Sequence, residues 1–331
     1  MNREDIYTST GAKLFQHTEQ LNRYRDGFPY TIIATHISPE GRCNLNCSYC
    51  SVTNRSRKER IDIQTIARYI YNVKNMGCKA VILTGGGEPT LYPRFHDVAG
   101  TIMNIGMDCA LITNGTTINK LKLYRIPFSW VRISVNNSPL WIKKFFEIKD
   151  KFLPETTVGL SFIYSGKNKR ISPSDLSRYA DNIDAKYVRI LPDCMQDDTK
   201  IDEGYSQIDE WIDGYDDQRF FIQRKKKGAP KSKICHQSYF RPYLSELGGG
   251  TVFPCDSIPL NNDTGKFDLK YKLCHPDEIY KFFRKEIIQQ FNAKKDCKGC
   301  VFTGNVNLID KYLKDGHNVC MVDKVEHENF I

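Results

Sequence analysis

The segment that decides the fold is GRCNLNCSYC, residues 41–50, which contains Cys43, Cys47 and Cys50. Three residues separate the first pair of cysteines and two separate the second pair. Thiolates are preferred ligands of iron–sulfur clusters, and a loop of this length can wrap three thiolates around one face of a cubane. A fourth iron then has no protein ligand, and an open coordination position marks a catalytic metal site. The spacing therefore favours a catalytic iron–sulfur cluster, with a zinc site completed by a distant Cys or His as the alternative.

The composition is typical of a cytosolic globular protein. Of the 331 residues, 40% are hydrophobic, which is enough for a sizeable core. No run of about 18 apolar residues predicts a membrane span, and MNREDIYTSTGAKLF at the start lacks the apolar stretch of a secretory signal. We therefore expect a cytoplasmic protein whose 12 cysteines serve metal binding or catalysis. The formal charge of +9 favours anionic partners and is equally compatible with ordinary solubility charge.

Segments with strand-like and helix-like patterns alternate around the cysteine loop. The expected strands are residues 30–37, 80–84, 109–113, 130–135, 157–164 and 187–191, and the expected helices are 61–76, 95–105, 118–123, 139–150 and 174–182. This alternation indicates parallel strands joined by crossover helices. Because about six units cannot close an eight-stranded barrel, we expect an α/β fold with a partial (β/α)6 TIM-like barrel. Reactive residues should then lie at the C-terminal ends of the strands.

Changes in composition suggest how the chain is organised. We expect an N-terminal extension with one short helix at 1–29, the barrel-like core at 30–195, a linker at 196–233 and a small α+β module at 234–331. The linker is acidic at first and then carries a basic run at 224–233. In the last module, Gly248–Gly250 predicts the turn of a hairpin, and residues 278–291 predict a helix.

A second motif, LTGGGEPT at residues 83–90, follows the second expected strand. Glycines let the backbone approach a ligand closely, and Glu88 adds a hydrogen-bond acceptor beside them. Together with the cysteine triplet, in which Tyr49 precedes the last cysteine, this motif resembles the radical SAM superfamily. The family's Gly-Gly-Glu-Pro motif matches Gly86, Gly87, Glu88 and Pro89, and the resemblance covers residues 30–192.

The resemblance implies a cofactor set and a mechanism. It implies a [4Fe-4S] cluster on the cysteine triplet and S-adenosylmethionine chelated to the fourth iron. An electron from the cluster, delivered by a reductant protein such as flavodoxin or ferredoxin, would cleave S-adenosylmethionine. The 5′-deoxyadenosyl radical would then take a hydrogen atom from the substrate. The family's cofactor contacts match Asn114, Ser134, Asn136 and Arg189 at strand ends or in strands, each equally compatible with a cap or turn residue, and Tyr49 would pack near the adenine.

Four later cysteines, Cys235, Cys255, Cys297 and Cys300, predict a second metal site. Cys255 follows Gly250 across the expected hairpin, and Cys297 and Cys300 form a C-x2-C pair. This arrangement resembles the SPASM and twitch modules and implies an auxiliary [4Fe-4S] cluster, whereas a zinc knuckle is the alternative. The further closely spaced cysteines of a full SPASM pattern are missing, which favours the shortened twitch form. Weaker candidates are Cys274 and Cys320 as substitute ligands, and His236 is expected to be a bystander.

The sequence leaves the substrate open, and with it the reaction class among oxidoreductase, isomerase and transferase. A small metabolite, nucleotide or modified base is the first expectation, since the basic run at 224–233 suits phosphate, although a solvated loop between modules is the favoured interpretation of that run. A peptide or protein side chain is the alternative, and the short stretch before the first strand counts against a separate peptide-recognition domain. The role of the auxiliary cluster is equally open among substrate oxidation, substrate binding and stapling of the module. A non-catalytic, metal-stapled nucleic-acid-binding protein would explain the charge and the cysteines but not the motif at Gly85–Pro89.

Overall fold

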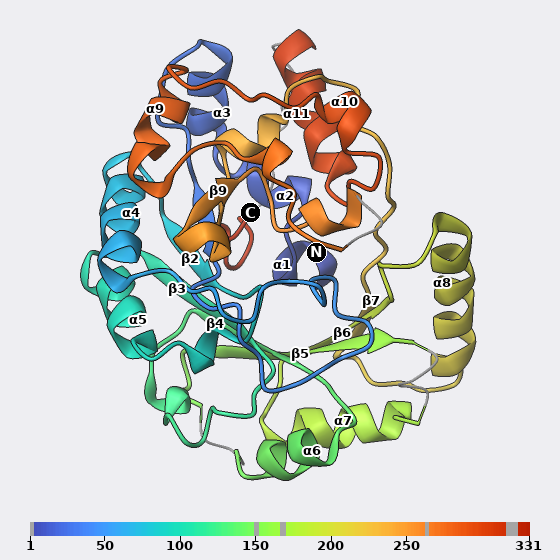
Figure 1. The fold of residues 1–331 in the computed structure, drawn as a ribbon. Coiled ribbons are helices and arrows are strands. Elements are labelled where there is room, and N and C mark those ends of the chain that lie inside the picture. The colour runs from blue at the N-terminus through green and yellow to red at the C-terminus, as the bar shows by residue number, and fades with distance from the viewer. Residues whose placement is uncertain (1–2, 149–151, 166–169, 262–264, 316–323) are drawn as a thin grey trace. The chain divides into compact units, whose positions relative to one another are not determined.

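The computed structural model describes residues 3–148, 152–165, 170–261, 265–315 and 324–331, and the chain forms two compact units (Figure 1). Unit 1 contains Met1–Cys43, Asn54–Cys109 and Lys225–Ile331, and unit 2 contains Asn44–Thr53 and Ala110–Arg224. The cysteine loop is therefore divided, with Cys43 in unit 1 and the other two cysteines of the triplet in unit 2. The domain boundaries expected from composition stay a prediction.

Unit 1 is built on four strands in the order β2-β1-β8-β9. β1 (Ala34–Ile37) pairs in parallel with both β2 (Ala80–Leu83) and β8 (Tyr243–Ser245). β9 (Thr251–Phe253) pairs with β8 in antiparallel fashion. The expected hairpin near Gly248–Gly250 is thus confirmed. It extends the parallel β1–β2 pair, whose strands lie on either side of the cysteine loop in the sequence, and the sequence did not predict this neighbour.

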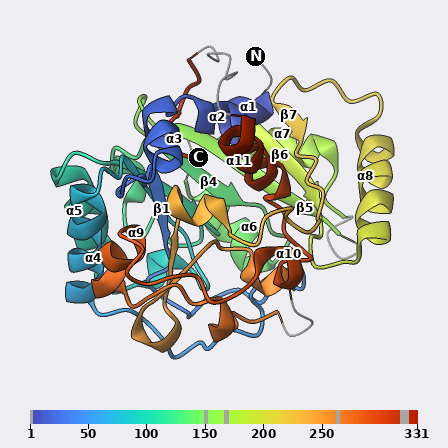
Figure 2. The ribbon, with the colours of Figure 1, turned by 90° about the horizontal axis from the view of Figure 1, so that it is seen from above.

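Two helices of unit 1 follow their expected positions closely. α4 (Ile63–Asn75) begins where the Asp62 carboxylate accepts hydrogen bonds from two backbone N–H groups, and it buries Ile66, Ile70 and Val73 on one face. α5 (Phe95–Asn104) and α9 (Ile279–Phe283) both pack against α4 (Figures 1 and 2). The helix expected over residues 278–291 is wrong beyond Phe283, because Lys285 adopts a left-handed φ of +62° that ends it.

The remaining helices of unit 1 are short, apart from the last. They are α1 (Arg3–Tyr7), α2 (Gly11–Phe15), α3 (Thr18–Arg25), α10 (Ala293–Asp296) and α11 (Thr303–Asp315). The expectation of one short helix before residue 30 is therefore wrong, because the N-terminal segment is broken by non-helical backbone at Thr10 and His17 into three. The first expected strand is also shorter than predicted, since it begins at Ala34.

Unit 2 contains parallel strands in the order β3-β4-β5-β6-β7. They are β3 (Asp108–Thr113, whose last four residues belong to this unit), β4 (Trp130–Ser134), β5 (Thr157–Tyr164), β6 (Tyr187–Pro192) and β7 (Phe220–Ile222). The crossover helices α6 (Pro139–Phe146) and α7 (Pro173–Asn182) each begin with a serine cap followed by proline. The expected α/β fold with parallel strands is confirmed.

Unit 2 also departs from the expectations in several places, and β7 is a strand within the expected linker. α8 (Asp198–Ile212) lies within the expected linker and packs against β6, burying Ile201, Tyr205 and Ile208. The sequence did not predict this helix, because its three apolar residues are widely spaced within a polar segment. The helix expected at 118–123 is instead a series of turns that ends in a 3-10 turn at Leu123–Arg125. The helix expected at 139–150 ends at Phe146, and residues 149–150 lie outside the described residues.

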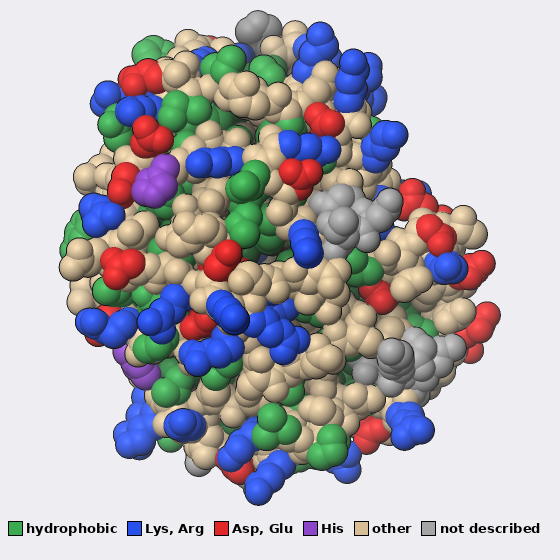
Figure 3. All heavy atoms as spheres, viewed as in Figure 1, with side chains coloured by type: hydrophobic (Ala, Val, Ile, Leu, Met, Phe, Trp, Pro, Cys, Tyr) green, Lys and Arg blue, Asp and Glu red, His purple; other side chains and the backbone are tan. Residues whose placement is uncertain are grey.

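The surface carries the positive charge in many separate places. Figure 3 shows Lys and Arg side chains over most of the viewed face, with Asp and Glu side chains among them. Within the described ranges, we find no helix with the length and apolar character needed to cross a membrane.

Candidate active site

The Gly85–Gly87 turn after β2 is hydrogen-bonded to the segment that leads into the cysteine loop. The Gly86 N–H donates to Ser38 Oγ at 2.6 Å. The Gly87 N–H donates to the Glu40 carbonyl at 2.9 Å, and the Glu88 N–H donates to the Arg42 carbonyl at 2.8 Å. Because Arg42 immediately precedes Cys43, unit 1 by itself fixes the glycine turn against the entry of the cysteine loop.

Side chains are excluded from this turn by close contacts. A Cβ atom on Gly87 would lie 2.2 Å from the Arg42 carbonyl oxygen, and one on Gly86 would lie 2.0 Å from Glu246 Oε1. Both distances are far below van der Waals contact. At Gly87 the obstructing atoms belong to the backbone, so only glycine fits there, whereas at Gly86 the Glu246 side chain would have to move. The glycines therefore admit the close approach of this chain's own Arg42 and Glu246, and the approach to a ligand stays a prediction.

Two buried carboxylates lie at the turn, and only one of them was expected. Glu88 caps the 3-10 turn at Pro89–Leu91, and its Oε1 accepts hydrogen bonds from Thr90 N at 3.2 Å and Thr90 Oγ1 at 2.6 Å. Glu246, in the connection between β8 and β9, is only 3% exposed and lies against Gly86. Burial raises the pKa of Glu246, and hydrogen bonds from Ser38 and Ser245 offset part of this rise. No local sequence signal marks Glu246, because the contact joins residues 160 positions apart.

Unit 2 holds the later part of the cysteine loop from the ends of β3 and β4. Asn136 Nδ2 donates to Cys47 Sγ at 3.2 Å and to the Tyr49 hydroxyl at 3.1 Å. The Tyr49 hydroxyl in turn donates to the Val135 carbonyl at 3.1 Å. The Cys50 N–H donates to the Cys47 carbonyl at 3.2 Å, which closes a turn between the two cysteines. Asn136 and Tyr49 were both predicted as cofactor contacts. Asn136 thus lies against the cysteine loop, in which Tyr49 is the residue before Cys50.

A second asparagine pair fixes the start of this loop segment. Asn114, which follows β3, donates from Nδ2 to Asn44 Oδ1 at 2.9 Å, and Asn44 Nδ2 donates to Thr116 Oγ1 at 2.8 Å. Asn44 and Thr116 were not singled out from the sequence, although Asn44 directly follows Cys43. The two side-chain amides and the Thr116 hydroxyl thus hold the start of this loop segment against the end of β3.

Ser134 and Arg189 lie in one row across the sheet of unit 2. Ser134 is in register with Ser161 of β5, and Ser161 is in register with Arg189 of β6. The Arg189 guanidinium donates to Ser161 Oγ at 2.8 Å and to Gln223 Oε1 at 3.0 Å. These bonds fix the guanidinium among the strands, and Ser161 and Gln223 join it in a polar row that the sequence analysis missed.

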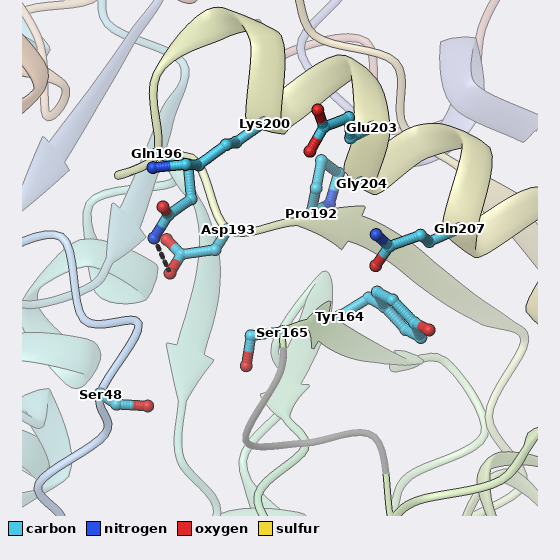
Figure 4. A pocket seen from close by; sticks show the side chains of 10 residues that line it. All are labelled: Ser48, Tyr164, Ser165, Pro192, Asp193, Gln196, Lys200, Glu203, Gly204 and Gln207. Atoms are coloured by element: carbon cyan, nitrogen blue, oxygen red, sulfur yellow. Dashed lines mark hydrogen bonds between the residues drawn. The ribbon is translucent and has the colours of Figure 1, made fainter.

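A pocket of about 490 Å³ opens in unit 2 where β5 and β6 end against α8 (Figure 4). Its size is within the usual range for small-molecule sites. The lining comprises Ser48, Tyr164, Ser165, Pro192, Asp193, Gln196, Lys200, Glu203, Gly204 and Gln207. Ser48 belongs to the cysteine loop, which makes this pocket part of the same site as Cys47 and Cys50. Ser165 Oγ is buried and has no hydrogen-bond partner among the described residues, so it offers an unused polar group.

The charges of the pocket come mainly from carboxylates. Asp193 and Glu203 both line it, whereas its one cation, Lys200, forms a salt bridge with Asp197 at 3.2 Å. Gln196 donates to Asp193 at 3.4 Å, the contact drawn in Figure 4. The pocket therefore favours hydrogen-bond donors and positive groups on a ligand over phosphates.

The four later cysteines line one cavity within unit 1. Cys235, Cys255, Cys297 and Cys300 all face it, together with apolar side chains such as Phe302. Burial raises the pKa of each thiol, and for three of them a neighbouring thiol of the quartet adds to the rise. Four thiols that share a cavity, three of them buried and that of Cys255 half-buried, form a donor set suited to an iron–sulfur cluster, whose positive irons would stabilise the thiolates. Within the described ranges, no group of three or more His, Cys, Asp or Glu side chains is placed to hold a single metal ion.

Backbone contacts shape the loops that carry this quartet. Gly299 lies between the last two cysteines, where a Cβ atom would lie 2.3 Å from the Leu260 carbonyl oxygen, and its N–H donates to Asn261 Oδ1 at 2.9 Å. The Cys235 N–H donates to Gln289 Oε1 at 2.9 Å. Cys274 is buried beside β9 and does not line the cavity, and Cys320 lies outside the described residues. His236 accepts or donates a 2.8 Å hydrogen bond with the Tyr24 hydroxyl.

A buried polar group connects β1 with the auxiliary cysteines. His36 on β1 lies 3.4 Å from the carboxylate of Asp256, the residue after Cys255, and its other ring nitrogen lies 3.1 Å from Arg241. The Arg241 guanidinium stacks over the Phe302 ring at 4.4 Å. Burial alone would raise the pKa of Asp256, but the His36 hydrogen bond and the charge of Arg241 outweigh it and hold the pKa below its usual range.

Comparisons with known proteins bear on this geometry. Residues 37–139 match the family described as the Radical SAM superfamily. A probable GTP 3′,8-cyclase from Pyrococcus abyssi is 30% identical over 135 residues, which is 39% of this chain and 43% of that protein. The chain thus matches less than half the length of this curated relative.

Two solved structures share the fold. Streptococcus suis SuiB bound to its precursor peptide SuiA superposes with a TM-score of 0.54 at 14% identity, covering 89% of this chain and 76% of SuiB. The enzyme anSMEcpe, with bound AdoMet and a peptide, superposes with a TM-score of 0.53 at 13% identity, covering 86% of this chain and 97% of that one. At these identities the likeness shows the fold alone.

Proposed function

We propose that the protein is an enzyme that binds a [4Fe-4S] cluster through Cys43, Cys47 and Cys50 and uses S-adenosylmethionine as its radical source, because residues 37–139 match the Radical SAM superfamily. When bound, the cluster supplies the electron that cleaves S-adenosylmethionine, and the resulting 5′-deoxyadenosyl radical removes a hydrogen atom from the substrate. The observation that carries the proposal is the double hydrogen bond from Gly87 and Glu88 to Glu40 and Arg42, since it joins the family's two motifs within one unit.

The residues of this chain position the ligands of that site. The Gly86–Gly87 turn is hydrogen-bonded to the entry of the cysteine loop, and the buried carboxylates of Glu88 and Glu246 beside it would offer acceptors for the amino group of the methionine moiety. Asn136 holds the thiol of Cys47 by a donated hydrogen bond, which also stabilises the thiolate form. Arg189 supplies a fixed positive charge in the polar row of unit 2, where a carboxylate would bind.

We propose an auxiliary [4Fe-4S] cluster on Cys235, Cys255, Cys297 and Cys300. The four thiols share one cavity, and Arg241 and His36 form a polar group next to Cys255. Its role would be to take an electron from a substrate radical, to bind substrate or to staple the module. A reductant protein such as flavodoxin or ferredoxin would supply electrons, and a cytoplasmic location stays a prediction from the sequence.

The pocket of unit 2 supports a substrate class. Asp193 and Glu203 repel phosphates, so a nucleotide would bind there through its base and not through a polyphosphate. A small metabolite or modified base with amino groups fits the lining, and a peptide carrying a basic side chain is the alternative with the same chemistry. The peptide alternative has support from the fold of SuiB and anSMEcpe, and the GTP cyclase relative supports the first class.

The test is anaerobic reconstitution with iron and sulfide, followed by dithionite and S-adenosylmethionine, with 5′-deoxyadenosine and iron measured together. We expect 5′-deoxyadenosine and about eight irons per chain, two cubanes' worth. The variant with Cys43, Cys47 and Cys50 all changed to Ala should form none, whereas Cys109→Ala, a buried cysteine in β3, should match the wild type. A protein with a full cluster load that never forms 5′-deoxyadenosine would show that the proposal is wrong.

A further inference from the structure

A groove of about 710 Å³ lies on unit 1, close to the auxiliary cysteines. It is bordered by the end of α3, by the segment after α9 and by α11, and α3 and α11 lie side by side in Figures 1 and 2. The lining residues contribute three cations, Arg25, Lys233 and Lys285, and no carboxylate. The groove is therefore positively charged along its rim.

The floor of the groove is apolar and unusually open to solvent. Ile288 is 63% exposed and Ile234 is 45% exposed, and Phe291 and Leu313 lie beside them. An apolar centre with a charged rim is the usual anatomy of a protein–protein interface. The floor thus presents a surface that a partner protein would cover.

Two of the three cations are free to meet a partner. Among the described residues, neither the Lys233 nor the Lys285 ammonium group has an ion-pair partner. Arg25 forms a salt bridge with Asp26 at 2.9 Å, and the nearby Glu286 lies 3.9 Å from Arg284. Lys233 ends the basic run that the sequence analysis identified at 224–233. The charge left over at the groove is positive and complements an acidic surface.

One residue in the wall of the groove, Gln289, is hydrogen-bonded to the backbone of Cys235. Gln289 lines the groove, accepts the Cys235 N–H at 2.9 Å and donates to the Lys233 carbonyl at 3.0 Å. Tyr24 and Tyr239 also line it, with ring centroids 5.0 Å apart, and Tyr24 bonds to the residue after Cys235. A partner seated in the groove would therefore contact Gln289 and Tyr24, which are hydrogen-bonded to Cys235 and His236.

We propose that this groove is the docking surface of an acidic one-electron-transfer protein that exchanges electrons with the auxiliary cluster. The inference rests on the proposed function, because it requires a cluster on the quartet. In each exchange the cluster loses one electron and the carrier gains one, or the reverse, and no bond of the protein forms or breaks. Three cations around an apolar floor suit a compact acidic protein surface, whereas a nucleic acid would require a longer basic track.

The test uses the protein lacking only the catalytic cluster, the variant with Cys43, Cys47 and Cys50 changed to Ala, so that the quartet holds the remaining iron. This protein is reduced with dithionite, freed of it and mixed rapidly with oxidised flavodoxin as the probe. The rate of flavin reduction and the dissociation constant are measured against ionic strength. The same measurements are made with Lys233→Glu/Lys285→Glu, with Ile288→Ser, and with the control Lys120→Glu/Lys143→Glu, whose lysines are exposed in unit 2.

We expect the groove double variant to slow flavin reduction and weaken binding by about tenfold or more at low salt, with the difference shrinking as salt rises. Ile288→Ser should weaken binding at every salt concentration, and the control pair should behave as the parent protein. The proposal is overturned if both groove variants bind and reduce flavodoxin as the parent protein does. It is also overturned if the groove variants lose affinity for RNA or for an acidic peptide but keep their affinity for flavodoxin. With the triplet intact, dithionite-driven 5′-deoxyadenosine formation should be unaffected by the groove variants. If the wild-type protein forms no 5′-deoxyadenosine, the proposed function is refuted, and not the docking surface.

Discussion

Gly87→Ala is the most informative single substitution, because the contact that it creates involves only backbone. The added Cβ atom would lie 2.2 Å from the Arg42 carbonyl oxygen, 2.5 Å from the Gly41 carbonyl carbon and 2.6 Å from that of Arg42. Ordinary contact lies near 3.5 Å, so the two segments must separate by about 1.3 Å, the difference between 3.5 and 2.2 Å. No side chain can rotate to absorb this movement.

The separation acts on the cysteine loop and on stability together. It breaks the hydrogen bonds from Gly87 to Glu40 and from Glu88 to Arg42, each worth about 1 kcal/mol net, so we expect a loss of about 2 kcal/mol in unfolding free energy. It also displaces the residue before Cys43. A misplacement of about 1 Å at a catalytic site can cost about 100-fold in rate, and we expect a fall of that order in 5′-deoxyadenosine formation.

Gly86→Ala and Gly100→Ala are the matched comparisons. At Gly86 the clash is with the Glu246 carboxylate at 2.0 Å, a side chain, so the loss should be smaller than for Gly87→Ala, and adding Glu246→Ala should recover part of it. Gly100 lies in α5 with no atom within 4 Å of the position that a Cβ atom would take, so alanine there should stabilise the protein by about 0.5–1 kcal/mol.

The assay measures 5′-deoxyadenosine formed per iron under dithionite, alongside urea unfolding of each variant. Normalising to iron separates a misplaced cluster from a missing one. A Gly87→Ala protein with wild-type rate and wild-type stability would contradict the reasoning, because the turn would then have room that the structure denies it. A Gly86→Ala loss that Glu246→Ala fails to relieve would mean that Glu246 is not the obstructing group.

Three further substitutions test other parts of the structure. Asn136→Ala removes the hydrogen bond to Cys47 Sγ and should lower 5′-deoxyadenosine formation about tenfold and alter the EPR signal of the reduced cluster, whereas an unchanged spectrum would place Asn136 outside the cluster's surroundings. Cys297→Ala should remove about half of the iron while uncoupled S-adenosylmethionine cleavage persists, and an unchanged iron content would refute the auxiliary site. Asp217→Asn should destabilise the protein by about 1–2 kcal/mol at pH 7, because the hydrogen bonds from Arg219, opposed by burial, hold the pKa of Asp217 well below its ordinary value. A carboxyl group whose pKa is depressed in the folded state stabilises the fold at pH values above its unfolded pKa of about 3.9, and this stabilisation is lost as the pH falls through its folded pKa. The difference in unfolding free energy between Asp217→Asn and the wild type should therefore shrink below about pH 4. A difference that stays constant with pH would refute the charge effect.

Local patterns predicted the chemistry proposed for this protein and most of its regular structure. The spacing of Cys43, Cys47 and Cys50 and the glycines at 85–87 are contiguous features, because ligands for one cluster and turns for one ligand come from short segments. The strands and helices of the core followed from apolar periodicity, which reflects burial on one face of each element. For the same reason α8 was missed, since its buried stripe of Ile201, Tyr205 and Ile208 is sparse within a polar sequence.

Only the tertiary structure decided which distant residues complete each site. Glu246 reaches Gly86 because the β8–β9 hairpin pairs with β1, and no pattern in either segment specifies that neighbour. The Ser134, Ser161 and Arg189 row depends on strand register, and the groove beside Cys235 depends on where Lys285 ends α9. Candidate ligands that lie within one loop can be read from the sequence of that loop. Contacts between distant elements depend on the packing of the whole chain, because that packing is the sum of many weak interactions.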